Sequence, residues 1–116
     1  MKSDFNNSLV IVWSSQDPDV ALNMVFMYCK NSMLKGWWGA VRMVVWGPSA
    51  KLLSEDQKLQ AELVEMKKVG VETLACKACA DRYGVSEKLE ELGCQVIYMG
   101  EPLTRYLKEG CMVLTF

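Results

Sequence analysis

The sequence predicts an open α/β fold in which a parallel sheet carries helices on both of its faces. Five short runs rich in Val, Ile and Leu are apolar at successive positions, as expected for strands covered on both sides; they lie at 8–13, 41–46, 71–76, 94–99 and 111–116. Helical patterns separate these runs, and such alternation favours parallel strands joined by right-handed crossovers. We therefore expect a three-layer α/β/α sandwich with a five-stranded, mainly parallel sheet.

Length and composition predict a single globular domain over residues 1–116. A chain of this length supplies one hydrophobic core but not two. The hydrophobic fraction of 51% is too high for a disordered chain. Lys and Arg are interspersed with Asp and Glu, and the net charge is −1, so no basic stripe is available to neutralise a phosphate backbone. Nucleic acid is therefore not an expected partner.

The apolar segments indicate a cytoplasmic protein that does not enter a membrane. The run that starts at Ser8 is too short for a signal peptide, and no run approaches the roughly 18 apolar residues of a membrane span. Thiols stay reduced in the cytoplasm, and the five cysteines are an odd number. A disulfide framework is therefore not expected.

The first expected helix begins after Asp17, which can cap it, with Pro18 at its first position. It should continue to about Met33 and stop before Gly36. An apolar stripe at three- and four-residue spacing is expected to face the core; it comprises Val20, Met24, Met27 and Tyr28.

A second helix is expected to begin at a capping box formed by Ser54 and Gln57 and to end at Gly70. A short helix should follow Cys76 and end near Gly84. Ser86 is expected to cap the next helix, which Gly93 closes, and a last helix should span about 101–109.

Adjacent tryptophans, Trp37 and Trp38, precede the second expected strand and so belong to a flank or to the amino-terminal edge of the sheet. Aromatic side chains are enriched at protein interfaces, so this pair is either a contact between subunits or part of the core.

The complete absence of histidine excludes several chemistries. Ser–His–Asp and Cys–His catalysis and every His-ligated metal site need an imidazole. Any reaction must therefore run through thiolate, carboxylate, Lys, Tyr or backbone groups.

Ligands of open α/β sheets bind at the carboxyl ends of the strands, so the segments leaving that edge are candidate sites. Backbone N–H groups near Ser14 and Ser15 are placed to hold an anion, unless these residues only form the turn and cap. The segment after the second strand lacks the Lys and the glycine spacing of a P-loop. The substrate-binding candidates at this edge are Ser14, Ser15, Trp46, Gly47, Pro48, Lys77 and Met99.

The cysteines fall into two groups. Cys29, Cys94 and Cys111 lie where small apolar side chains are expected and should be buried. Cys76 and Cys79 instead lie where a strand ends and a helix starts. A helix amino terminus stabilises a thiolate there, and the charges of Lys77 and Arg82 can add to this effect.

Two other uses of a Cys-x-x-Cys pair are less compatible with the sequence. A zinc site needs four ligands, and the remaining cysteines are isolated. A thioredoxin-like couple fits a pair at a helix start, but here the pair lies midway through an apparently parallel sheet. We therefore expect no metal.

The chain resembles the DsrE/DsrF-like (YchN-like, TusD-related) family of small sulfur-handling proteins from about residue 8 to residue 116. The likeness rests on "LVIVWSSQDP", "VVWGPSAKLL" and above all "GVETLACKACADRYGV". The most specific feature is a strand that ends in Cys, followed by seven residues and Gly-Val, which places the family's nucleophilic cysteine at Cys76.

The resemblance implies a sandwich assembled into homotrimers or hexamers, and sulfur transfer through a persulfide on Cys76 without a cofactor. The partners would be persulfide donors and acceptors, either proteins or small thiols. A low-pKa thiolate that attacks a donor persulfide is consistent with this chemistry. Members with relay activity often lack a second cysteine, so whether Cys79 resolves the persulfide or only packs is open, as is whether the chain is an active sulfurtransferase.

Two alternatives from other functional classes remain at this point. One is a non-catalytic, oligomeric module that binds a small ligand in an edge pocket formed by Trp13, Trp46 and Met99. The other is a dithiol redox module built on Cys76 and Cys79.

Overall fold

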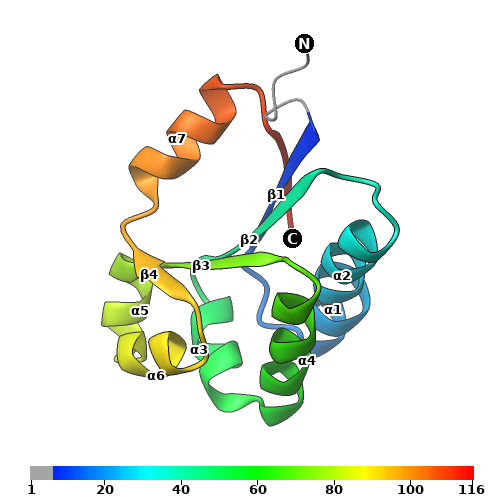
Figure 1. The fold of residues 1–116 in the computed structure, drawn as a ribbon. Helices are drawn as coiled ribbons and strands as arrows, with labels where there is room; N and C mark the ends of the chain where they lie inside the picture. Colours follow the sequence, from blue (N-terminus) through cyan, green and yellow to red (C-terminus); the bar gives the residue numbers. More distant parts are fainter. Residues whose placement is uncertain (1–6) are drawn as a thin grey trace.

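The computed structural model describes residues 7–116 and contains one five-stranded sheet (Figure 1). The strands pair in the order β4-β3-β2-β1-β5, and all four pairings are parallel. The predicted fold class is confirmed, with a sheet that is parallel throughout. The strands are β1 (Ser8–Trp13), β2 (Ala40–Val45), β3 (Glu72–Cys76), β4 (Gln95–Ile97) and β5 (Met112–Thr115).

The helices are distributed unequally over the two faces of the sheet. Figure 1 shows α7 alone on one side, with the other helices gathered on the opposite side. The helical segments are α1 (Pro18–Val20), the π-helical η2 (Ala21–Phe26), α2 (Met27–Leu34), α3 (Ser49–Glu55), α4 (Gln57–Lys68), α5 (Lys77–Tyr83), α6 (Ser86–Glu91) and α7 (Gly100–Lys108). None of them is long and apolar enough to cross a membrane.

Strand β1 shows how the sheet divides the core in two. Leu9, Ile11 and Trp13 pack with buried side chains from η2 through α6. Val10 and Val12 point to the other face, where Tyr106 of α7 covers them. All six residues of β1 are buried, since the alternation of side chains along a central strand sends apolar groups into both layers.

The first helix covers the expected span, but its buried face differs from the prediction. The residues of η2 form i→i+5 turns, so side chains four and five positions apart lie on the same face of the helix. Ala21, Val25 and Phe26 are therefore buried together. The expected stripe is therefore rotated: Met24 and Met27 are 48% and 51% exposed. The methionines predicted to pack in the core instead form part of the surface.

Two of the predicted helix starts are wrong. The helix over 49–55 was not expected, and Ser54 lies inside it, where its hydroxyl donates to the carbonyl of Lys51. Asp56 caps α4 by accepting from the N–H of Leu59 at 3.0 Å, because an aspartate after the short α3 is closer to the free N–H groups.

Ser86 is likewise not a cap, since it is the first residue of α6 and its hydroxyl donates to Asp81. By contrast, Asp17 does cap the first helix, accepting from the N–H of Asp19 at 2.8 Å, with Pro18 at the first position as predicted.

The corrected cap of α4 leads to a direct test. We expect Asp56→Ala to lower the free energy of unfolding by about 1 kcal/mol, because the N–H of Leu59 loses its acceptor. Ser54→Ala, the matched control, should change it by less than about 0.5 kcal/mol. Urea denaturation of both variants measures this, and a larger loss for Ser54→Ala would restore the capping box predicted from the sequence.

Candidate functional site

The site is built where β3 ends and α5 begins. Cys76 is the last residue of β3, with extended backbone (φ −68°, ψ 115°), and the helix starts at the next residue. Cys79 lies in the first turn of α5, which Ala80 anchors in the core. Gly84 ends the helix with φ 69°, in the left-handed region that favours glycine.

Both thiols pack into the layer between the sheet and α7. Cys76 is 5% exposed and belongs to a buried cluster with Val44, Leu74 and Met99. Cys79 is half-buried against the same cluster. Other partly buried side chains pack against this cluster, among them Trp46, Ile97 and Leu103. The two sulfurs thus lie in an apolar environment that opens to solvent at Cys79.

Cys79 makes two hydrogen bonds that connect the site. One joins it to the thiol of Cys76, and in the other the backbone N–H of Gly47 donates to its sulfur. Gly47 follows β2, whose neighbour is β3, so the parallel pairing brings the turn after β2 against the start of α5. Gly47 has φ 77° and free space where a Cβ would stand, so its conformation, and not a lack of room, favours glycine.

Opposing effects act on the pKa of Cys79. Burial raises it above its ordinary value, and the hydrogen bond with Cys76 and the negative charge of that thiolate raise it further. The N–H of Gly47 and the positive charge of Arg82 lower it, and the net direction is upward. Cys79 therefore keeps its proton while it faces the sulfur of Cys76.

Lys77 has its own partners. Its ammonium group forms an ion pair with Asp81 at 3.0 Å and lies 5.8 Å from the centre of the Tyr98 ring. The hydrogen bond with Asp81 raises the pKa of Lys77. Arg82 is the cation whose charge acts on Cys79.

The serines at the end of β1 are occupied by backbone contacts. The hydroxyl of Ser14 donates to the carbonyl of Phe116 at 2.9 Å, and that of Ser15 accepts from the N–H of Asp17 at 3.0 Å. Pro48 is exposed before α3. Of the nine predicted site residues, the structure brings together Cys76, Cys79, Trp46, Gly47 and Met99.

The sequence pattern did not predict a structural role for Ser49, whose hydroxyl is buried at this edge of the sheet. Ser49 is fully buried, donates to the carbonyl of Trp13 and lies 3.3 Å from that of Trp46. It ties the ends of β1 and β2 together, as does the N–H of Trp46, which donates to Trp13 at 3.0 Å. The hydroxyl of this serine is thus used by backbone carbonyls.

The small-ligand pocket envisaged from the sequence is not assembled. Trp13 is fully buried on the face of the sheet that η2 through α6 cover, where its ring meets Phe26 edge-on. Trp46 and Met99 lie on the other face. Side chains alternate along a strand, so the end of β1 directs Trp13 away from them.

The other three cysteines are buried, as predicted. Desolvation raises the pKa of Cys29 to about 12 and that of Cys94 to about 11. It also raises the pKa of Cys111. Thiols with pKa values near 11 or 12, here Cys29 and Cys94, are protonated and poorly nucleophilic at neutral pH.

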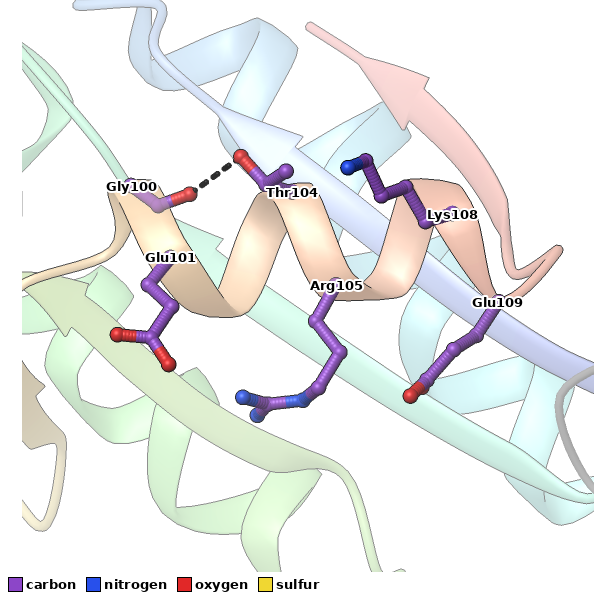
Figure 2. A pocket seen from close by; sticks show the side chains of 6 residues that line it. All are labelled: Gly100, Glu101, Thr104, Arg105, Lys108 and Glu109. Atoms are coloured by element: carbon purple, nitrogen blue, oxygen red, sulfur yellow. Dashed lines mark hydrogen bonds between the residues drawn. The ribbon is translucent and has the colours of Figure 1, made fainter.

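The part of the chain that the structure describes offers no metal cluster beside this pair, and the hollow over α7 is a surface feature. In residues 7–116 no three His, Cys, Asp or Glu side chains gather as metal ligands. A shallow hollow lies over the solvent face of α7; it is lined by Gly100, Glu101, Thr104, Arg105, Lys108 and Glu109 (Figure 2). Thr104 there bonds to the carbonyl of Gly100 at 2.7 Å, within its own helix. The hollow is the charged outer surface of one helix.

A second surface is apolar and lies between the first helix and the edge strand β5. We call it the methionine groove; it is lined by Asn23, Met24, Met27, Tyr28, Asn31, Trp37, Leu114 and Phe116. Trp37 is 51% exposed and its ring stacks near Tyr28, whereas Trp38 donates its indole N–H to the Tyr28 hydroxyl at 3.2 Å.

Proteins of known structure share this fold. A conserved protein of unknown function from Bacteroides thetaiotaomicron is 38% identical over the whole of both chains, with a TM-score of 0.95. A protein of unknown function from Methanobacterium thermoautotrophicum (19% identity, TM-score 0.73, 94% and 98% of the two chains) and the ychN protein of E. coli (15%, 0.68, 96% and 99%) share the fold.

No functionally curated protein matches the sequence. The model of the DsrE/DsrF-like family matches residues 40–116, which include β2, the turn at Gly47, both cysteines of the pair and α7. The chain therefore belongs to the DsrE/DsrF-like family.

Proposed function

We propose that this protein accepts and passes on sulfane sulfur as a persulfide on Cys76. Family membership implies a function related to sulfur relay. The observation that carries the specific proposal is the contact between the thiols of Cys76 and Cys79 at the carboxyl edge of the sheet. The other cysteines are protonated and buried, so this pair is where thiolate chemistry is possible.

The surroundings of Cys76 suit a bound sulfur atom. A donor persulfide R–S–SH transfers its outer sulfur when the Cys76 thiolate attacks it, which gives Cys76–S–SH and releases R–S⁻. Apolar neighbours limit the access of water to the product. The thiol of Cys79 lies beside that of Cys76, at the point where the sulfur would be added.

The expected partners are persulfide donors and acceptor thiols, on proteins or small molecules. The reaction as written needs no metal and no organic cofactor, because thiolates act as both nucleophile and leaving group. We assign it to the cytoplasm, where thiols are kept reduced.

We also propose that the chain forms a homo-oligomer, a trimer or a hexamer, through the methionine groove. Apolar side chains from η2, α2 and β5 adjoin there, and β5 is an edge strand. Exposed apolar surface of this kind favours association with a second copy.

The persulfide proposal predicts where sulfur is found. Trypsin cuts after Lys68, Lys77 and Arg82, so Cys76 and Cys79 fall in separate peptides, 69–77 and 78–82. Cys79→Ser incubated with glutathione persulfide and then alkylated should gain one reducible sulfur on peptide 69–77. Cys94→Ser, whose replaced cysteine is also 5% exposed, should load like the wild type. Absence of sulfur from peptide 69–77 in both variants would refute the proposal.

The assembly proposal predicts that Met27→Glu gives a monomer of about 13.1 kDa in light scattering. A carboxylate in the methionine groove would lose hydration when the surfaces meet. Leu107→Glu on α7 is the matched control, because Leu107 is 56% exposed and Met27 51%, both on helices. A wild type that is already monomeric, or equal dissociation by both substitutions, would contradict this role of the groove.

A further inference from the structure

Cys79, the half-buried thiol of the pair, is positioned to react with a persulfide formed on Cys76. Cys79 is hydrogen-bonded to Cys76, and a Cys-x-x-Cys pair at a helix start is an arrangement in which disulfides form and break. A sulfur atom added to Cys76 leaves the Cys76 sulfur itself in place, directly opposite Cys79. The inner sulfur of the persulfide is therefore the atom that Cys79 can reach.

The contacts of Cys79 prepare it for negative charge as well as for holding a proton. The N–H of Gly47 donates to its sulfur, and the guanidinium of Arg82 acts on it with a positive charge. Both would stabilise a thiolate that forms during attack. The N–H comes from the turn after β2 and the positive charge from α5, and both act on Cys79 before any sulfur arrives.

Formation of the persulfide on Cys76 also weakens two of the influences that raise the pKa of Cys79. While Cys76 is a thiolate, the hydrogen bond to it and its charge both raise the pKa of Cys79. In the persulfide the negative charge is on the outer sulfur, one bond further from Cys79. The influences of Gly47 and Arg82, which lower the pKa, are then opposed mainly by burial.

We propose that Cys79 discharges the persulfide on Cys76 as sulfide and leaves a Cys76–Cys79 disulfide. This inference rests on the proposed function. In the step, the thiol proton of Cys79 passes to the outer sulfur of Cys76–S–S⁻. The sulfur of Cys79 bonds to the Sγ of Cys76, the S–S bond of the persulfide breaks, and HS⁻ leaves.

The electrons balance within the site. The sulfane sulfur is reduced to sulfide, and the two cysteine thiols are oxidised to one disulfide. Two equivalents of a small thiol, or one dithiol, return the pair to the reduced state and are themselves oxidised to a disulfide. By this route a loaded chain acts as a persulfide reductase that uses thiols, and the N–H of Gly47 and the charge of Arg82 assist the second thiol.

The test compares the wild type with Cys79→Ser, with Cys94→Ser as the control. Each chain is loaded with glutathione persulfide, freed of donor by desalting, and left without reductant. We expect the wild type and Cys94→Ser to release about one sulfide per chain and to yield peptide 69–77 disulfide-linked to 78–82. Cys79→Ser should keep its sulfur on peptide 69–77 and release sulfide about tenfold more slowly or slower.

Arg82→Gln provides a second, milder variant, because Arg82 is exposed and its loss should leave the fold intact. It should load normally but release sulfide several-fold more slowly. The inference is overturned if the loaded wild type keeps a persulfide with Cys79 free to be alkylated, or if Cys79→Ser releases sulfide as fast as the wild type. If Cys79→Ser takes up no sulfur and Cys94→Ser neither holds sulfur on peptide 69–77 nor releases sulfide, the proposed function itself is overturned.

Discussion

The parallel pairing of β2 with β3 is the constraint on which the site depends. Because the two strands run side by side in the same direction, their carboxyl ends meet at one edge. The turn at Gly47 then lies against the first turn of α5, where its N–H reaches the sulfur of Cys79. Ser49 and the N–H of Trp46 tie the same turn to β1. Core strands thus fix the position of a backbone donor that acts on a thiol.

The surroundings of each sulfur separate the paired thiols, Cys76 and Cys79, from the other cysteines. Cys29 and Cys94 are enclosed by apolar surroundings that raise their pKa values to about 12 and about 11. Cys76 is as little exposed as Cys94, but its thiol faces a second thiol that is open to solvent. Exposure alone therefore does not distinguish these cysteines, and the difference lies in the partner of each sulfur.

The sequence pattern was sufficient for the fold class and for the junction that carries the pair. Apolar runs mark strands buried on both faces, and Gly84 marks the end of a helix that starts after Cys76, both of which the structure confirms. The exposure of Met24 and Met27 was not predictable in this way, because it follows from a π-helical stretch that shifts the buried face. The contact between Gly47 and Cys79 joins residues far apart in the chain and depends on strand order.

We propose that the junction of β3 and α5 holds the reactive thiols of this chain. Brief alkylation of the native wild type with iodoacetamide at neutral pH, followed by unfolding, trypsin and mass spectrometry, tests it most directly. We expect label on peptides 69–77 and 78–82, while Cys29, Cys94 and Cys111 stay unmodified until the chain unfolds. Labelling of those three cysteines at the rate of the pair would contradict it.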